Sequence, residues 1–362
     1  MGMVLVILLL IHPKTMAFIE SRLKPGMGEL TLVKELQLPH SSQIRYEKME
    51  QYLVQYWDGV LYAYQGDGTQ YWTLPIEIKQ PRMVSGEQGL LLLDGEAHQL
   101  VRVNPQGELI YQVDLNQSVE SFETSEQGHG LVYYTPGEGP LRILEIFGPE
   151  GETLGEITLN EGEVIKSSIS GSSDRVFIYT LGIQQDGLVG QLQVFNLKGE
   201  LIAVEKLPNE ISLWMAMGKD HLLYMATDLA LISFTPEGTI QWRKSLEAIH
   251  GVTEHGSGLL LVSFKGKPSG GIFQNKEGDK VMVFQRNGEI TGEISFPEAI
   301  TGTALWDKKI LIYGNRSLYL YDPQGKQEIS YSYPGDIEGA WMLSENQMAV
   351  ITREKLSFYQ VN

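Results

Sequence analysis

Three residues with metal-ligand side chains lie close together in the sequence: His250, Glu254 and His255, within "HGVTEHG". Imidazole and carboxylate groups bind zinc, and zinc-binding histidines on a helix stand four residues apart so that both face the ion. His250 and His255 are five apart in a segment of strand-like composition. Residues five apart on a strand point to opposite faces. The spacing therefore favours an ordinary strand, and metal ligation is the weaker alternative.

Composition excludes several other kinds of chemistry. The chain has no Cys, which rules out disulfides, thiolate metal sites and thiol nucleophiles. It has no G-x-S-x-G element and no glycine-rich loop that opens a helix to hold a phosphate. The formal net charge of −17 argues against a nucleic-acid partner, which needs a basic surface. We therefore assign no catalytic residue, metal or cofactor, and expect no nucleic-acid binding.

The elements that must position any site come from a repeat. A twelve-residue sequence motif with a fixed glycine occurs in seven copies, called the repeated phrase below. Examples are "NPQGELIYQVDL" from Asn104 and "TPEGTIQWRKSL" from Thr235. Successive fixed glycines are 39, 44, 48, 39, 50 and 37 residues apart. A period of about 40 to 50 residues is typical of the four-stranded blades of a β-propeller. The glycines are Gly68, Gly107, Gly151, Gly199, Gly238, Gly288 and Gly325.

Each phrase predicts a hairpin at the outer side of a blade. An alternating strand such as "LYAYQ" precedes the phrase, a residue such as Asn104 starts the turn, and the glycine takes the position that needs positive φ. The strand that follows has a polar face and is expected to be outermost. Apolar runs that precede each phrase, such as "LLLLD" from Leu90, are typical of strands covered on both faces. We expect these runs to be the second strands of the blades. Short mixed segments such as "SLWMAMG" fit innermost strands.

The two ends of the chain complete one another. The C-terminal "QMAVITREKLSFYQVN" supplies a second and a third strand but no fourth, whereas Pro25–Pro39 supplies a turn glycine, Gly28, and an outer strand with nothing before it. We predict that residues 30–38 pair with residues 354–360 and close the ring. The fold class is therefore all-β, an eight-bladed propeller, with seven blades as the alternative. The expected blades are 43–76, 80–115, 118–159, 163–207, 210–246, 248–296, 299–333, and 335–362 with 29–39.

The phrases "LYAYQGDGTQYW" and "LISFTPEGTIQW" resemble the repeat of PQQ-like β-propellers, and the resemblance covers residues 29–362. It implies three kinds of relative. Quinoprotein dehydrogenases hold pyrroloquinoline quinone and calcium, and barrel-assembly scaffold propellers of outer membranes hold no cofactor. Small bacterial membrane-anchored propellers of unknown function form the third kind, to which the apolar N-terminus makes this chain most similar. The quinone and calcium ligands of the dehydrogenases have no matching positions here.

The N-terminus suggests export. Met3–Ile11 is a run of nine apolar residues, shorter than the roughly 20 that span a bilayer but within the 7–15 or so of a signal-peptide core. Thr15 and Ala17 suit a cleavage after Ala17, although no Lys or Arg precedes the run. A buried element of the fold is the alternative. We expect residues 1–28 to be a signal or anchor segment with a stalk, and residues 29–362 to be one domain outside the cytoplasm in the bacterial cell envelope.

Two connections between second and third strands are long, and loops on a rigid scaffold often carry function. They lie in Leu181–Leu192 and Ser263–Phe284, and the second is locally rich in Lys. We predict a non-catalytic binding or scaffolding propeller that docks a protein partner there, with membrane contact through the N-terminal segment only. The candidate partner-binding residues are Lys265, Lys267, Ile272, Phe273, Lys276 and Lys280, together with Tyr56 and Trp57.

Two other functions stay open. A quinoprotein-like oxidoreductase, or another enzyme that uses the central funnel, would be favoured by convergent carboxylates or a cation on the axis. A polysaccharide-binding module would need exposed aromatic rings in a row, for which Tyr56 and Trp57 are the candidates. Trp72 and Trp242 occupy the same position of two repeats and are expected to pack between blades.

Overall fold

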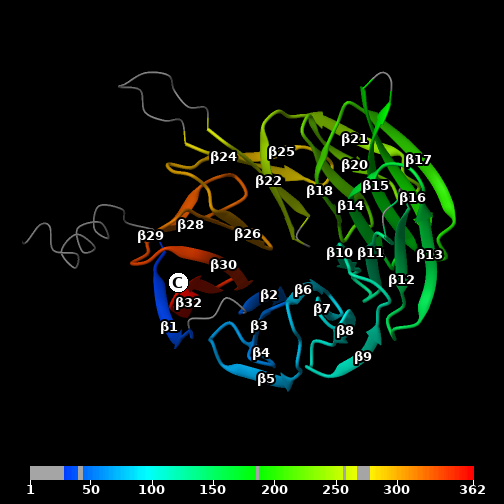
Figure 1. Cartoon of the computed structure of the whole chain (residues 1–362). Coiled ribbons are helices and arrows are strands. Elements are labelled where there is room, and N and C mark those ends of the chain that lie inside the picture. The colour runs from blue at the N-terminus through cyan, green and yellow to red at the C-terminus, as the bar shows by residue number, and fades with distance from the viewer. Residues whose placement is uncertain are drawn as a thin grey trace, which may run out of the picture.

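The strands form a ring around a central axis (Figure 1). The computed structural model describes residues 28–39, 44–137, 139, 141–184, 187–255, 258–266 and 278–362. Within them lie eight four-stranded antiparallel sheets, the blades, and the assigned regular elements are all strands. No helix in these ranges is long and apolar enough to cross a membrane.

In blades 1 to 4 the strands follow one another from the axis outward. Blade 1 consists of β2 (Arg45–Met49), β3 (Tyr52–Trp57), β4 (Val60–Tyr64) and β5 (Gln70–Pro75). Blade 2 consists of β6 (Pro81–Gly86), β7 (Gly89–Asp94), β8 (Gln99–Val103) and β9 (Leu109–Asp114). Blade 3 consists of β10 (Ser121–Thr124), β11 (Gly130–Tyr134), β12 (Arg142–Phe147) and β13 (Thr153–Leu159). Blade 4 consists of β14 (Glu163–Ser170), β15 (Arg175–Gln184), β16 (Gly187–Asn196) and β17 (Leu201–Pro208).

Blades 5 to 7 repeat this order, and blade 8 takes its outermost strand from the N-terminal part of the chain. Blade 5 consists of β18 (Ser212–Met217), β19 (Leu223–Thr227), β20 (Ala230–Phe234) and β21 (Ile240–Ser245). Blade 6 consists of β22 (Ile249–His255), β23 (Leu259–Phe264), β24 (Lys280–Gln285) and β25 (Ile290–Ser295). Blade 7 consists of β26 (Gly302–Trp306), β27 (Lys309–Tyr313), β28 (Ser317–Tyr321) and β29 (Gln327–Ser332). Blade 8 consists of β30 (Ile337–Ser344), β31 (Gln347–Thr352), β32 (Lys355–Val361) and β1 (Leu30–Gln37).

The predicted closure of the ring is confirmed. β1 pairs antiparallel with β32, from Leu30 opposite Val361 to Gln37 opposite Lys355. The eight-blade count is therefore right and the seven-blade alternative is wrong. Just before β1, the Gly28 N–H donates to the Glu328 carbonyl of blade 7 at 3.0 Å.

The repeated phrase forms the predicted hairpin. All seven fixed glycines have φ between 77° and 91°. In blade 2 the Gly107 N–H donates to the Asn104 carbonyl at 3.0 Å, and the Asn104 side chain accepts the amides of Gln106 and Glu108 at 3.0 and 2.9 Å. The register shifts directly after Arg102, as expected for a turn closed by a glycine bulge. The turn is thus a product of local chemistry.

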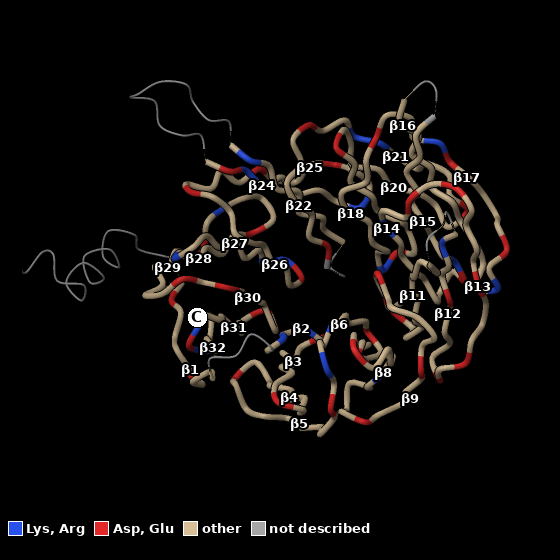
Figure 2. The backbone as a smooth tube through the Cα atoms, in the orientation of Figure 1, with Lys and Arg blue, Asp and Glu red and all other residues tan. Residues whose placement is uncertain are grey.

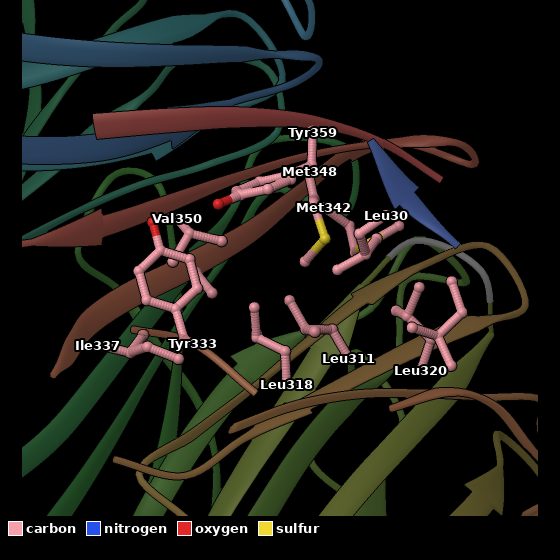
Figure 3. Close-up of a cluster of buried hydrophobic side chains, with 12 residues drawn as sticks. Leu30, Leu311, Leu318, Leu320, Tyr333, Ile337, Met342, Met348, Val350 and Tyr359 are labelled. Carbon is pink, nitrogen blue, oxygen red and sulfur yellow. The ribbon is translucent and has the colours of Figure 1, made fainter. Parts of the chain in front are cut away.

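The core consists of eight apolar clusters, one between each pair of neighbouring blades in the described residues. Figure 3 shows the cluster between blades 7 and 8, in which Leu30 of β1 packs near Met342, Met348 and Leu320. The tryptophan prediction is confirmed. Trp72 reaches the next blade and donates its indole N–H to the Pro105 carbonyl at 2.9 Å. Trp242 likewise donates its indole N–H to the Arg286 backbone carbonyl at 2.7 Å.

Connections within a blade alternate between the two faces of the ring, because the strands are antiparallel. First turns join innermost to second strands, and third turns join third to outermost strands. Both lie on one face, which we name the first-turn face. Second turns and the links to the next blade lie on the other, the link face. Any site on the axis or on either face is therefore built from loops of several blades.

Candidate functional site

A cavity of about 800 Å³ lies on the axis and opens at the first-turn face. Its walls are the ends of the innermost strands of blades 1 to 7 and the first turns that follow them. Its apolar lining includes Ile169, Met215, Met217 and Trp306. Its charged lining is Lys48, Glu50, Glu87, Glu123, Glu126, Lys219, His221 and Glu254. We call this the axial cavity.

Two contacts cross the axial cavity between blades that are not neighbours. Lys219 of blade 5 pairs with Glu87 of blade 2 at 2.6 Å, and both side chains are about half exposed. The Lys48 ammonium of blade 1 lies 4.6 Å from the centre of the Trp306 ring of blade 7. Acidic and basic segments are interspersed around the ring in Figure 2.

Blades 3, 4 and 5 are joined at the rim of the cavity by a polar network. The Ser172 hydroxyl lies 2.7 Å from Nδ1 of His221, a distance suited to proton transfer from a nucleophile to a base. The Ser172 amide, however, donates to Glu126 at 2.8 Å. Glu126 thus binds the backbone beside the hydroxyl rather than orienting the imidazole, as the acid of a catalytic triad does. In the described residues this network joins blades and does not complete a triad.

Blades 5 and 6 share a second network around Arg286, which lies in the third turn of blade 6. Its guanidinium is 3.6 Å from Glu254 and 3.5 Å from Asp220. Asp220 also accepts the Tyr224 hydroxyl at 2.6 Å. Burial raises the pKa of Glu254 to about 7, against the opposing effect of Arg286. Glu254, which the sequence grouped with two histidines, is therefore engaged by an arginine.

Two more carboxyl groups near the axis titrate close to neutral pH. Burial raises the pKa of Glu123 to about 7, and Lys166 lowers it only in part. Burial likewise raises the pKa of Glu47 to about 7, although the Ser85 hydroxyl donates to its carboxylate at 2.8 Å. Folding favours the neutral form of each group. Their contribution to stability is present at acid pH and is lost as the pH rises towards 7.

We expect Glu47→Gln to stabilise the protein in a pH-dependent way. Gln stays neutral and can still accept the Ser85 hydroxyl, so its advantage over Glu should grow by about 1.4 kcal/mol between about pH 6 and pH 8, most of it below pH 7. Urea unfolding at both pH values measures the difference. Glu237→Gln, at an exposed third turn, is the control and should show no such trend. A constant difference for Glu47→Gln would contradict the assignment.

The axial cavity does not fit calcium with pyrroloquinoline quinone. Calcium takes about six to eight oxygen ligands, which in proteins include Asp and Glu carboxylates. Here Glu87 is held by Lys219, Glu254 by Arg286 and Glu126 by the Ser172 amide. No group of three His, Cys, Asp or Glu side chains within the described ranges could hold a metal ion.

The predicted partner-binding residues that the structure describes all lie on or next to the link face. Lys265 follows β23 and Lys280 begins β24, and both are exposed. Trp57 lies at the second turn of blade 1 and is half-buried. The candidates that lie outside the described residues are Lys267, Ile272, Phe273 and Lys276.

Tyr56 is buried, and its assignment to a sugar-binding surface is wrong. Its side chain is 3% exposed. The hydroxyl donates to the Ile78 carbonyl at 2.8 Å and accepts the Ile78 amide at 2.9 Å, in the link to blade 2. The inward face of β3 packs against the next blade, so a row of exposed rings does not form there.

The axial residues were missed by sequence reasoning, although one signal was present. Glu-Gln recurs at the first turns of three successive blades, as Glu50-Gln51, Glu87-Gln88 and Glu126-Gln127. A polar pair in the same register of three repeats predicts carboxylates around one opening. Their partners Lys219 and Trp306 carry no such signal.

Solved structures with the same architecture span nearly the whole chain. BamB from Moraxella catarrhalis is 13% identical with a TM-score of 0.55, and the match covers 92% of this chain and all of that one. The C-terminal WD40 domain of Sif2 is 12% identical with a TM-score of 0.64, covering 93% and 99%. The Dos1 propeller is 12% identical with a TM-score of 0.59, covering 91% and 95%. At sequence identities this low, the structural similarity to these proteins establishes the fold of the chain alone.

Among curated proteins, none matches this sequence. A protein family does match, over residues 26–361, and is described as "Family of unknown function (DUF5711)".

Proposed function

The chain belongs to this family of unknown function, and we propose that it is a non-catalytic binding propeller that docks a protein partner on its link face. We further propose that it acts outside the cytoplasmic membrane, tethered or released through the apolar run Met3–Ile11, and that its repeats are of the PQQ-like type. Propellers as different as BamB and the Sif2 WD40 domain share its architecture, which supports a scaffold rather than a particular chemistry.

The observation that carries the proposal is the hairpin of blade 4. β15 and β16 have ten residues each, whereas β7 and β8 of blade 2 have six and five. The additional pairs run from Leu181 opposite Gly190 to Gln184 opposite Gly187, beyond the link face. Ile183 on this extension is 86% exposed, the highest value among the described large apolar side chains. A paired hairpin that presents an apolar side chain is preorganised for docking.

Blade 6 adds charge to the same face. Lys265 and Lys280 flank the long connection between β23 and β24, and Lys280 also contacts Glu293 at 3.2 Å. In a protein of net charge −17, these lysines favour a partner with an acidic rim around an apolar contact. Lys267, Ile272, Phe273 and Lys276 remain part of the proposed surface from the sequence, and Trp57 could extend it to blade 1.

Site-specific photo-cross-linking in the native host tests the proposal. A cross-linker at position 183 should capture one partner, identified by mass spectrometry, and Ile183→Asp should weaken its binding at least about tenfold. The control is Ile290, which is 57% exposed on β25 beside a third turn, on the opposite face. Equal capture from both positions, or a partner whose binding ignores Ile183→Asp, would show that the link face is not the docking surface.

A further inference from the structure

Among the residues that the structure describes, Lys48 is the lysine of the axial cavity that has no carboxylate partner. Glu87, Glu126 and Glu254 each have a polar or charged partner, as described above. Glu50 is exposed to solvent, and Glu123 holds its proton up to about pH 7. No ion pair between described residues includes Lys48. The Lys48 ammonium instead lies over the face of the Trp306 ring.

This environment is unfavourable for an ammonium. Burial and the nearby charge of Lys219 lower the pKa of Lys48 to about 8. A ring face stabilises a cation by about 0.5 to 2 kcal/mol, which is less than a paired carboxylate supplies to a buried ammonium. An anion placed beside Lys48 would therefore be held by an ammonium that no described carboxylate pairs with.

We propose that the axial cavity binds a ligand through a single carboxylate that pairs with the Lys48 ammonium, with an apolar group against Trp306 and the neighbouring apolar wall. The carboxylate could belong to a free organic acid or to the C-terminus of a peptide. This site lies on the first-turn face and is separate from the docking proposed for the link face.

The charge of the cavity selects a monoanion. A cationic ligand would meet Lys48 and Lys219 together, and these already repel one another. A phosphate dianion would face Glu87, Glu123, Glu126 and Glu254 around the same space. A single carboxylate offsets the charge of Lys48 and places half the charge of a dianion beside these carboxylates. Met215 and Met217 supply flexible apolar surface for the rest of the ligand.

The affinity should fall as the pH rises. Lys48 loses its proton near pH 8, and Glu123 and Glu254 gain negative charge near pH 7. Both changes oppose a bound carboxylate, so the affinity should drop between about pH 6.5 and pH 9. The other titratable groups around the space are Lys219 and His221 of blade 5, Glu87 of blade 2, Glu126 of blade 3 and Glu50 of blade 1.

Calorimetric titration of the full chain tests the site with matched probes. N-acetyl-leucine is compared with N-acetyl-leucinamide, and an acetylated tripeptide ending in leucine with its amide. Each acid should bind at least about tenfold more tightly than its amide. Lys48→Met should abolish this preference, Lys48→Arg should retain part of it, and Lys198→Met, at an exposed third turn, should leave it unchanged.

The comparison of N-acetyl-leucine with the tripeptide acid identifies the source of the carboxylate. Similar affinities for the two acids point to a small organic acid, and selective binding of the tripeptide acid points to a peptide C-terminus. Equal binding of acids and amides, a preference that survives Lys48→Met, or no binding of any acid up to about 10 mM would each overturn the proposal. The thermal midpoint of each variant shows whether it is folded.

Discussion

Leu30→Asp should open the ring and destabilise the protein by about 4 kcal/mol. Leu30 is 9% exposed and belongs to the apolar cluster between blades 7 and 8, with Met348 and Tyr359 (Figure 3). The substitution places a carboxylate in this cluster without a cation to pair with it. It also weakens the attachment of β1, which covers the otherwise open edge of β32. The thermal midpoint should fall by roughly 6 °C.

Leu32→Asp is the matched control on the same strand. Leu32 is 49% exposed, so a carboxylate there remains in water, and we expect a change within about 0.5 kcal/mol. Calorimetry and urea unfolding of both variants measure the contrast. If the two substitutions had equal effects, β1 would not seal blade 8 through its buried face, and the closure of the ring would depend on backbone pairing alone.

The second large effect is expected for Gly107→Ala, at about 3 kcal/mol. Gly107 has φ of 84°, and a Cβ there would lie 2.5 Å from the Trp72 ring. The ring cannot move away easily, because its N–H donates to the Pro105 carbonyl in the same turn. A left-handed conformation costs an L-residue about 1 to 2 kcal/mol, and overpacking adds about 1 to 3.

Two variants separate these two contributions in urea unfolding. Gly137 has φ of 67°, and no atom of the described residues beyond its chain neighbours lies within 4 Å of its Cβ position, so Gly137→Ala should show the conformational part alone, about 1 kcal/mol. Trp72→Ala combined with Gly107→Ala should cost less than the sum of the single substitutions, because removal of the ring removes the clash. Full additivity would mean that the ring does not contact the turn.

Elements that depend only on neighbouring residues were predictable from the amino-acid sequence. Gly107 and its six counterparts predicted the third turns. A glycine shortly after an Asn or Pro permits the positive φ of the turn, and this preference does not depend on the rest of the fold. The period between these glycines, with the incomplete blades at Gly28–Pro39 and at the C-terminus, predicted eight blades closed by β1. The shared position of Trp72 and Trp242 in two repeats also predicted their contacts between blades.

The residues that meet across the ring are set by the three-dimensional arrangement of the blades and were not predictable from the sequence. Lys48 and Trp306, or Glu87 and Lys219, come from blades that are not neighbours, and their pairing depends on the diameter of the ring and the ends of its innermost strands. Alternation within β3 likewise did not show that the face of Tyr56 is covered by the link at Ile78. Local patterns determine strands and turns, because these interactions are short in sequence. The axial cavity and its charges arise only when eight blades bring distant first turns together.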